Sequence, residues 1–259
     1  MTTPAARLRA LHHGRTPDDP LVLPGPWDAV SARAFEEAGF PALATPSAGV
    51  SATLGYEDGG GTPPDEMFAA VARIVRSVDV PVSADIETGY GLPPAEIVER
   101  LLEAGAAGCN LEDSAPDGTG LEDACRQADR LAAVREAAGD ALVINARVDT
   151  FLRGDRGPDE AIARGRLYAA AGADCVYPIL APPRLLPELA AGIGCPLNAL
   201  AVPDGPSPRE LGELGATRVT FGGGLHARAA AAVRDLARSL RTDQLSRTTA
   251  PEGPTADKT

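Results

Sequence analysis

The sequence is poor in features that would each indicate a particular class of protein. Aromatic residues make up 4% of the 259 residues, so the core has to be built mainly from small and branched aliphatic side chains. The single lysine, Lys258, lies near the C-terminus, which argues against an aldolase that forms a Schiff base within a barrel. No apolar run approaches the roughly 20 residues that span a bilayer. The N-terminus lacks the apolar core of a signal peptide, and we expect a cytoplasmic protein.

Basic side chains are scarce relative to acidic ones. The formal net charge is −12, which argues against nucleic acid and anionic membranes as partners because both require basic patches. A small anionic substrate would therefore need a local reversal of charge by a metal ion or by arginines. The four cysteines form no CxxC pair, so their spacing predicts neither a zinc site nor a disulfide framework.

Apolar strand-like runs alternate with helical segments along most of the chain. The expected strands cover residues 21–23, 41–45, 80–85, 108–111, 142–146, 174–178, 196–199 and 218–221. Several helices end in the letters AGF, AGAAG, AGAD or LGAT just before a strand. Eight such units predict an α/β fold of the (β/α)8 TIM-barrel type, and no GxGxxG follows the first strand to indicate a dinucleotide-binding sheet. We expect a leader over residues 1–20, a catalytic barrel over 21–241 and a disordered polar tail over 242–259.

Polar residues gather where the expected strands end, which in a barrel is the catalytic face. They are Trp27 after the first strand, Ser47, Ala48 and Gly49 after the second, Asp85 and Glu87 after the third, Glu112 after the fourth, Arg147 and Asp149 after the fifth, Tyr177 after the sixth and Asn198 after the seventh. Asp58 lies in the long connection after the second strand, which can fold back over the barrel mouth. Since residues i and i+2 of a strand share a face, we expect Asp85 and Glu87 to point the same way.

The acidic members of this set form an oxygen-rich cluster without histidine or cysteine. Asp58, Asp85, Glu87 and Glu112 suit Mg²⁺, or Mn²⁺, better than zinc. The alternative is that some of them cap helices or pair with arginines. Arg147 can grip an anionic substrate through two parallel bonds, or it can form a structural pair with Glu112 or Asp149.

Four motifs, in order, resemble the isocitrate lyase/phosphoenolpyruvate mutase superfamily. They read PSAGVSATLGYEDGGG, VSADIETGYG, GCNLEDS and INARVDTF, and the resemblance extends over about residues 21–240. It implies a barrel whose last helix is exchanged with a partner subunit, commonly in a dimer of dimers. It also implies Mg²⁺ bound at Asp85, with Asp58, Glu87 and Glu112 mainly holding its waters.

The same resemblance implies the roles of the remaining site residues. Arg147 would contact an α-keto acid or its enolate, and the loop Ser47–Gly49 would donate backbone N–H groups to the substrate carboxylate. Together with Asp58, we expect Trp27 and Asn198 to line the substrate site. Arg147, Glu112 and Tyr177 are the candidate catalytic residues, while Tyr56 or a metal-bound water is an alternative acid or base.

Other motifs of the superfamily are missing. Its isocitrate and methylisocitrate lyases carry a Lys-Lys/Arg-Cys-Gly-His loop after the fourth strand, and its phosphonomutases an asparagine there. Residues 115–120 read APDGTG instead. We therefore expect an Mg²⁺-dependent lyase-type enzyme acting beside an α-keto or 2-hydroxy acid, but not a standard isocitrate or methylisocitrate lyase. The alternatives are a phosphonopyruvate or phosphoenolpyruvate mutase or hydrolase, and a catalytically idle metal-binding barrel.

Overall fold

Eight parallel strands form the centre of the computed structural model, which describes residues 2–115, 118–154 and 157–248. The strands are β1 (Leu21–Val22), β2 (Leu43–Thr45), β3 (Val82–Asp85), β4 (Gly108–Glu112), β5 (Val143–Val148), β6 (Cys175–Pro178), β7 (Asn198–Leu200) and β8 (Arg218–Thr220). Strands β2 to β6 pair in order, and β1, β8 and β7 form a second group. Every pairing is parallel.

Two seams join these groups into a closed barrel. Between β6 and β7, Val176 bridges to Leu197, and its N–H donates to the Pro196 carbonyl at 2.9 Å. Between β1 and β2, the Ala44 N–H donates to the Pro24 carbonyl at 3.1 Å. The predicted (β/α)8 barrel is therefore confirmed.

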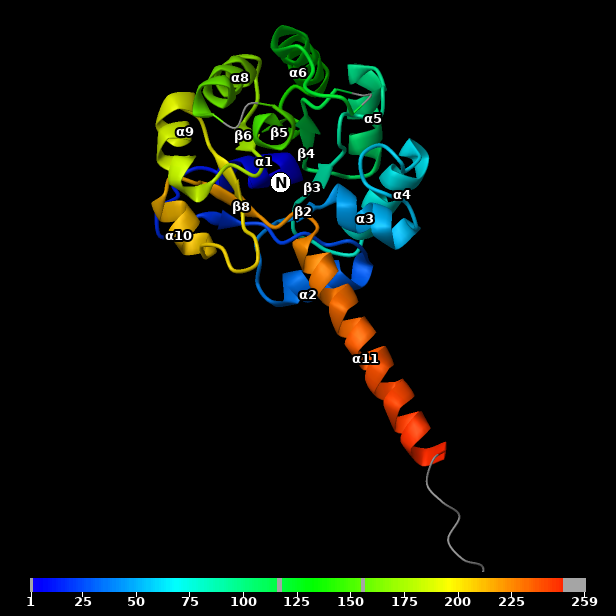
Figure 1. Cartoon of the computed structure of the whole chain (residues 1–259). Helices are drawn as coiled ribbons and strands as arrows, with labels where there is room; N and C mark the ends of the chain where they lie inside the picture. The colour runs from blue at the N-terminus through cyan, green and yellow to red at the C-terminus, as the bar shows by residue number, and fades with distance from the viewer. Residues whose placement is uncertain (1, 116–117, 155–156, 249–259) are drawn as a thin grey trace, which may run out of the picture.

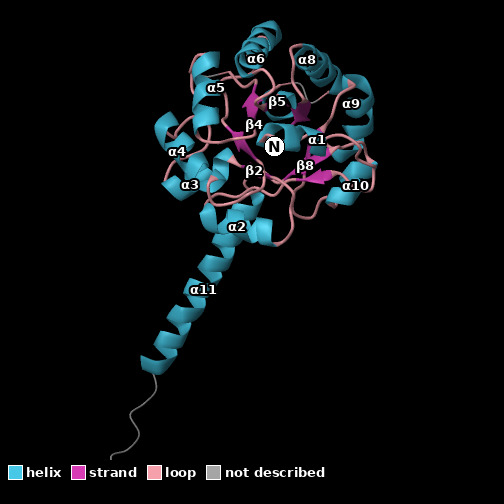
Figure 2. Cartoon of the chain, turned by 180° about the vertical axis from the view of Figure 1, so that it is seen from behind, coloured by secondary structure: helices cyan, strands magenta, loops and turns pink. Residues whose placement is uncertain are grey.

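Helices surround the strands on all sides (Figures 1 and 2). They are α2 (Ala29–Glu37), α3 (Ser47–Leu54), α4 (Pro64–Val75), α5 (Pro94–Glu103), α6 (Ala124–Ala138), α7 (Thr150–Arg153), α8 (Pro158–Ala170), the 3-10 turn η1 (Pro183–Leu185), α9 (Leu186–Ile193) and α10 (Pro208–Glu213). Asp28 caps α2 by accepting from the Ser31 N–H, and prolines open several others. Gly39, Gly105, Gly172 and Gly215 have positive φ angles, which explains why glycine recurs at these helix ends.

The N-terminal segment is folded against the barrel. Helix α1 (Pro4–Leu11) begins at the cap residue Thr3, and Leu8 is fully buried in an apolar cluster with Leu21 and Val143. Arg9 donates to the Asp174 carboxylate at 2.8 Å. Part of the expected leader thus belongs to the packed structure.

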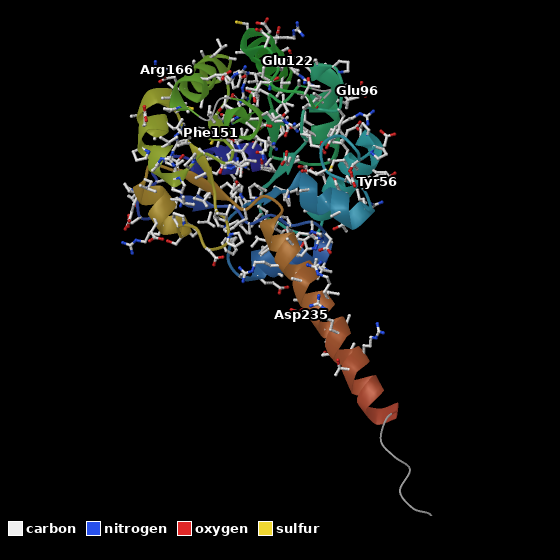
Figure 3. All side chains as sticks on the ribbon, viewed as in Figure 1. Tyr56, Glu96, Glu122, Phe151, Arg166 and Asp235 are labelled. Atoms are coloured by element: carbon white, nitrogen blue, oxygen red, sulfur yellow. The ribbon has the colours of Figure 1, made fainter. Side chains whose placement is uncertain are left out.

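The last helix, α11 (Gly224–Thr248), leaves the barrel and projects away from it (Figure 1). Every residue from 232 to 242 is exposed, and Figure 3 shows the side chains around Asp235 standing clear of the barrel. The helix continues beyond residue 241, where we expected disorder to begin, and residues 249–259 lie outside the described part of the chain. Exchange of α11 with a partner subunit stays a prediction.

The interior of the barrel is polar. Strand register places Asp85 beside Asn110, and Asn110 beside Asn145. The Asn145 side-chain amide donates to Asn110 Oδ1 at 2.8 Å, and Arg218 donates to the same oxygen at 3.4 Å. The apolar core lies between the strands and the surrounding helices. In the described part of the chain, no helix is both long enough and apolar enough to cross a membrane.

Candidate active site

A cavity of about 200 Å³ opens at the carboxyl ends of the strands. Its lining comprises Ala44, Thr45, Pro46, Ser47, Ala48, Asp58, Asp85, Asn110, Arg147, Leu152, Tyr177, Ile179, Leu180, Thr220, Gly222 and Gly223. The structure therefore brings together six of the predicted site residues: Ser47, Ala48, Asp58, Asp85, Arg147 and Tyr177. Asp58 reaches the cavity because the connection between α3 and α4 folds back over the mouth.

Asp85 ends strand β3 as a buried carboxylate with few hydrogen-bond donors. The Ser47 hydroxyl donates to Oδ2 at 3.2 Å, and the Glu87 N–H donates to Oδ1 at 3.3 Å. Burial raises the pKa of Asp85, and the charge of Asp58 adds to that rise, while Arg147 opposes it. The described residues include no cationic side chain in ion-pair contact with Asp85. A buried carboxylate in this position is suited to a hard cation.

Glu87 lies close to Asp85, but not because the two residues share a strand face. Strand β3 ends at Asp85, and Glu87 follows with a φ of 52°, so the two residues do not share a strand face. Burial, Asp58 and Asp85 raise the pKa of Glu87 to about 7. Tyr90 donates its hydroxyl to Glu87 at 3.4 Å. Across the described ranges, no three Asp, Glu, His or Cys side chains are arranged to hold a metal ion directly.

Arg147 is held by carboxylates on two sides. One Nη contacts Glu112 at 2.6 Å, while Nε and the other Nη donate to the two oxygens of Asp149 at 2.7 and 2.9 Å. The structural pairing considered as an alternative for Arg147 is therefore present, yet the guanidinium also lines the cavity. Burial raises the pKa of Glu112, and Arg147 opposes that rise.

Strand register sets these residues side by side. Glu112 on β4, Arg147 on β5 and Tyr177 on β6 are direct cross-strand neighbours. The Tyr177 hydroxyl is buried and makes no hydrogen bond of ordinary length with the described residues. Burial raises its pKa to about 12, and the nearby Thr220 hydroxyl opposes that rise. A phenol in this state keeps its proton at neutral pH and can donate it to a ligand.

Contacts that the sequence did not predict fix Asp149. The Ser114 hydroxyl donates to Asp149 Oδ2 at 2.5 Å, and Arg153 donates to Ser114 at 2.8 Å. The Asp149 N–H donates to Asp113 at 2.8 Å. These bonds hold Asp149 in place as the partner of Arg147.

Ser47, Ala48 and Gly49 form the first turn of helix α3, not the loop that we expected. Pro46 precedes the helix as its cap residue and makes no side-chain cap bond. The first N–H groups of a helix have no acceptors within it, and the helix dipole favours negative charge at this end. The helical form therefore supplies the backbone N–H donors that we expected from a loop.

Other predicted residues lie outside the cavity lining. Trp27 packs against His226, with ring centroids 5.3 Å apart. Asn198 is fully buried and accepts from the Thr220 hydroxyl at 3.2 Å. Gly49 lies within α3, where an added side chain would meet Pro46 and His226. In the segment 115–120, Pro116 and Asp117 lie outside the described residues.

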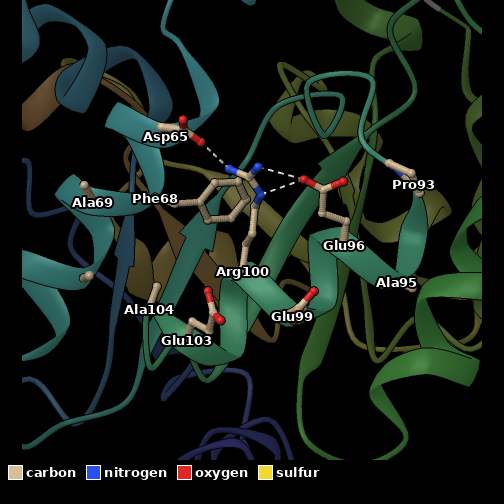
Figure 4. Close-up of a pocket in the computed structure, with 11 residues that line it drawn as sticks. Asp65, Phe68, Ala69, Pro93, Ala95, Glu96, Glu99, Arg100, Glu103 and Ala104 are labelled. Carbon is tan, nitrogen blue, oxygen red and sulfur yellow. Dashed lines mark hydrogen bonds and ion pairs between the residues drawn. The ribbon is translucent and has the colours of Figure 1, made fainter.

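A larger groove of about 850 Å³ lies between helices α4 and α5 on the outside of the barrel (Figure 4). Arg100 crosses it and is already paired with Asp65 at 2.5 Å and Glu96 at 2.7 Å. Its guanidinium also lies 5.7 Å from the centre of the Phe68 ring. Because its cation is fully engaged and its other charges are acidic, this groove is poorly suited to an anionic substrate.

The fold and the site define an α/β-barrel protein with a buried, oxygen-rich centre at its catalytic face. The family model described as phosphoenolpyruvate phosphomutase matches residues 8–241. The chain belongs to this family, within the PEP mutase/isocitrate lyase superfamily that the motifs predicted. It is thus an enzyme of the carbon–carbon lyase and phosphonomutase group.

Two relatives show how far the sequence similarity extends. The protein Rv1998c of Mycobacterium tuberculosis (strain H37Rv) is 38% identical over 229 residues, covering 86% of each chain. The 2-methylisocitrate lyase of Bacillus subtilis (strain 168) is 33% identical over 183 residues, covering 67% of this chain and 59% of the lyase.

Two solved structures share the architecture. A 2,3-dimethylmalate lyase has a TM-score of 0.83 at 31% identity, with 94% of this chain and 86% of that chain covered. An oxaloacetate acetylhydrolase in complex with oxalate has a TM-score of 0.84 at 28% identity, with 98% of this chain and 92% of that chain covered.

Proposed function

We propose that this protein is an Mg²⁺-dependent lyase that cleaves a carbon–carbon bond next to a small 2-hydroxy or α-keto acid through an enolate. One observation carries the proposal. The cavity joins a buried, unpaired carboxylate (Asp85), a fixed guanidinium (Arg147) and the start of helix α3. These are the parts required to bind an acid and to stabilise negative charge that develops beside it.

The substrate carboxylate would accept from the free N–H groups at the start of α3, where the helix dipole adds to the attraction. Arg147 would face the oxygen that gains charge in the enolate. Its orientation is already fixed by Asp149 and Glu112, so little reorganisation is needed when the charge appears. The small cavity would exclude bulk water around that oxygen.

The oxygen donor set fits Mg²⁺, or Mn²⁺, as the metal. Asp85 would bind it directly, and Asp58, Glu87 and Glu112 would hold its waters. The bound metal would supply Lewis-acid stabilisation of the developing negative charge. By holding a cation, these carboxylates would allow an acidic protein to bind an acidic substrate at this site.

Tyr177 is the proposed proton donor to the leaving carbon, and Glu112, the neighbouring candidate catalytic carboxylate, is the proposed acceptor of the substrate's 2-hydroxyl proton. Tyr177 lines the cavity beside Arg147, and its protonated hydroxyl makes no hydrogen bond of ordinary length with the described residues, although Thr220 lies near it. Carbon–carbon cleavage is favoured over phosphonate chemistry because Arg147 is the one cationic side chain among the described residues of the lining. Homo-oligomerisation and a cytoplasmic location remain expectations from the sequence.

The relatives define a short panel of acids for a turnover test. We would incubate the protein with 2,3-dimethylmalate, 2-methylisocitrate, oxaloacetate, phosphonopyruvate and phosphoenolpyruvate, with Mg²⁺ or with EDTA, and follow the products by NMR. We expect cleavage of at least one 2-hydroxy or α-keto acid, lost in EDTA and in Asp85→Ala. Asp65→Ala, a carboxylate in the outer groove, is the matched control. Undiminished turnover by Asp85→Ala would contradict the metal assignment.

A further inference from the structure

The two sides of the candidate cavity differ in chemistry. One side carries Asp85, Asp58, Arg147 and the start of α3. The other is formed by Leu152 on α7 and by Ile179 and Leu180, which follow strand β6. A substrate held by its acid end on the first side would therefore present its other substituent to aliphatic side chains.

Leu180 is held at the cavity rim by an unusual backbone turn. The Ala181 N–H donates to the Pro178 carbonyl at 3.2 Å, which closes a four-residue turn. Leu180 is the third residue of this turn and has a φ of 59°, where glycine or asparagine is usual. The residue remains 46% exposed. The turn thus places a large apolar side chain at the mouth, where a glycine would have suited the backbone better.

The cavity can match only a limited number of negative charges. Its positive features are the Arg147 guanidinium, the N-terminal end of α3 and the proposed metal site at Asp85. These suffice for two carboxylates and a developing oxyanion. A third carboxylate would face Leu152, Ile179 and Leu180, where the described lining offers it no cation. Because Leu152 and Leu180 are 40% and 46% exposed, that carboxylate would keep part of its hydration, but it would lose the rest without gaining a protein partner.

The cavity size favours a small substrate over a larger one. A cavity of about 200 Å³ holds the volume of about seven waters at ~30 Å³ each. Resting on the proposed function, we propose that the natural substrate is a 2-hydroxy dicarboxylate that carries a short alkyl substituent, and that Leu180 and Leu152 select against a third carboxylate.

Two acids from the same panel form a matched pair for this test. 2,3-Dimethylmalate and 2-methylisocitrate differ only at C3, where the first carries a methyl group and the second a carboxymethyl group. Cleavage of the C2–C3 bond gives pyruvate from both, with propionate or succinate as the other product. We would measure kcat/KM for each acid and, separately, the displacement of oxalate by each in the presence of Mg²⁺.

We expect the wild-type protein to prefer 2,3-dimethylmalate by at least about tenfold, the scale on which pocket contacts discriminate between substrates. Leu180→Arg adds a cation at the rim and should narrow this ratio by about tenfold. Leu102→Arg is the matched control because Leu102 is 44% exposed on α5, away from the cavity lining; it should leave the ratio unchanged. If Leu180→Arg fails to fold, Leu152→Arg tests the same rim.

Equal or better use of 2-methylisocitrate by the wild-type protein would overturn the inference while leaving the proposed lyase function standing. If neither acid is cleaved but 2,3-dimethylmalate displaces oxalate more strongly, the selectivity is supported and the proposed cleavage fails. If neither acid displaces oxalate, or if both rim variants leave the ratio at its wild-type value, the inference is overturned.

Discussion

Replacement of Arg147 by methionine tests how the centre of the site is held together. The substitution keeps most of the side-chain volume but removes three contacts, to Glu112 at 2.6 Å and to Asp149 at 2.7 and 2.9 Å. Asp149 is fully buried and Glu112 nearly so, so both carboxylates lose their cation in a poorly solvated environment. Breaking a buried ion pair from one side costs about 3–5 kcal/mol. For a chain of this size that lowers Tm by about 6–20 °C, at ~2–4 °C per kcal/mol.

Thermal unfolding at one fixed protein concentration measures this effect, because subunit association would otherwise shift Tm. Arg209→Met is the matched control: its partner Glu213 lies 3.1 Å away, but both side chains are at least half exposed. An exposed pair contributes about 0–1 kcal/mol, so its Tm should fall by less than about 4 °C. Adding Glu112→Gln to Arg147→Met should recover part of the loss by removing one unpaired charge. Equal decreases in Tm for Arg147→Met and Arg209→Met would refute the reasoning.

Three further predictions concern other parts of the chain. Burial and Arg218 lower the pKa of His12 to about 4. As pH falls, His12 is therefore protonated in the unfolded chain before it is protonated in the folded one, and the free energy of unfolding should fall by about 3 kcal/mol between about pH 6.5 and pH 4. In thermal unfolding measured across this pH range, His12→Gln should not show that loss of stability. Plots of Tm against pH that run parallel for the wild-type protein and His12→Gln would contradict the prediction. An exposed apolar stripe on α11 is formed by Val233, Leu236 and Leu240, and we expect it to pack against a partner subunit. Leu236→Asp should therefore weaken association and reduce the molar mass measured by light scattering. An unchanged molar mass would contradict a role of α11 in assembly. Tyr177→Phe removes a buried hydroxyl that makes no hydrogen bond of ordinary length with the described residues, so Tm should be unchanged or raised. The same variant should lower kcat by about 100-fold or more, and an unchanged kcat would exclude Tyr177 as the proton donor.

The barrel was predictable because its signals are local and repeated. Asp28, Pro64 and Pro94 mark helix starts, and glycines such as Gly39 and Gly172 mark helix ends. Helix α1 was missed although Thr3 and Pro4 carry a start signal. Its packing depends on contacts between Leu8 and strands far along the chain, which no local pattern reveals.

The candidate site was predictable only where strand ends determine it. Asp85, Arg147 and Tyr177 follow from counting strands, and all three line the cavity. Glu87 was placed near Asp85 by a strand alternation, but the strand ends at Asp85, two residues before Glu87.

The apolar rim had no sequence signal. Leu180 reaches it through a positive φ that leucine rarely adopts. Trp27 and Asn198 follow the expected strands but point into packing contacts instead. Strand ends therefore identify which residues can meet at the barrel mouth, while side-chain packing decides which of them face the cavity.

Titration calorimetry with oxalate tests most directly whether this cavity stabilises an enolate on a metal-dependent acid site. Oxalate is a planar dianion that presents the same pair of neighbouring oxygens as an α-keto acid or its enolate, and it needs no turnover to report binding. We predict measurable binding by the wild-type protein in Mg²⁺, with none detected in EDTA or in Asp85→Ala, while Asp65→Ala retains wild-type affinity. Oxalate binding that is unaffected by EDTA and by Asp85→Ala would contradict the proposed mechanism.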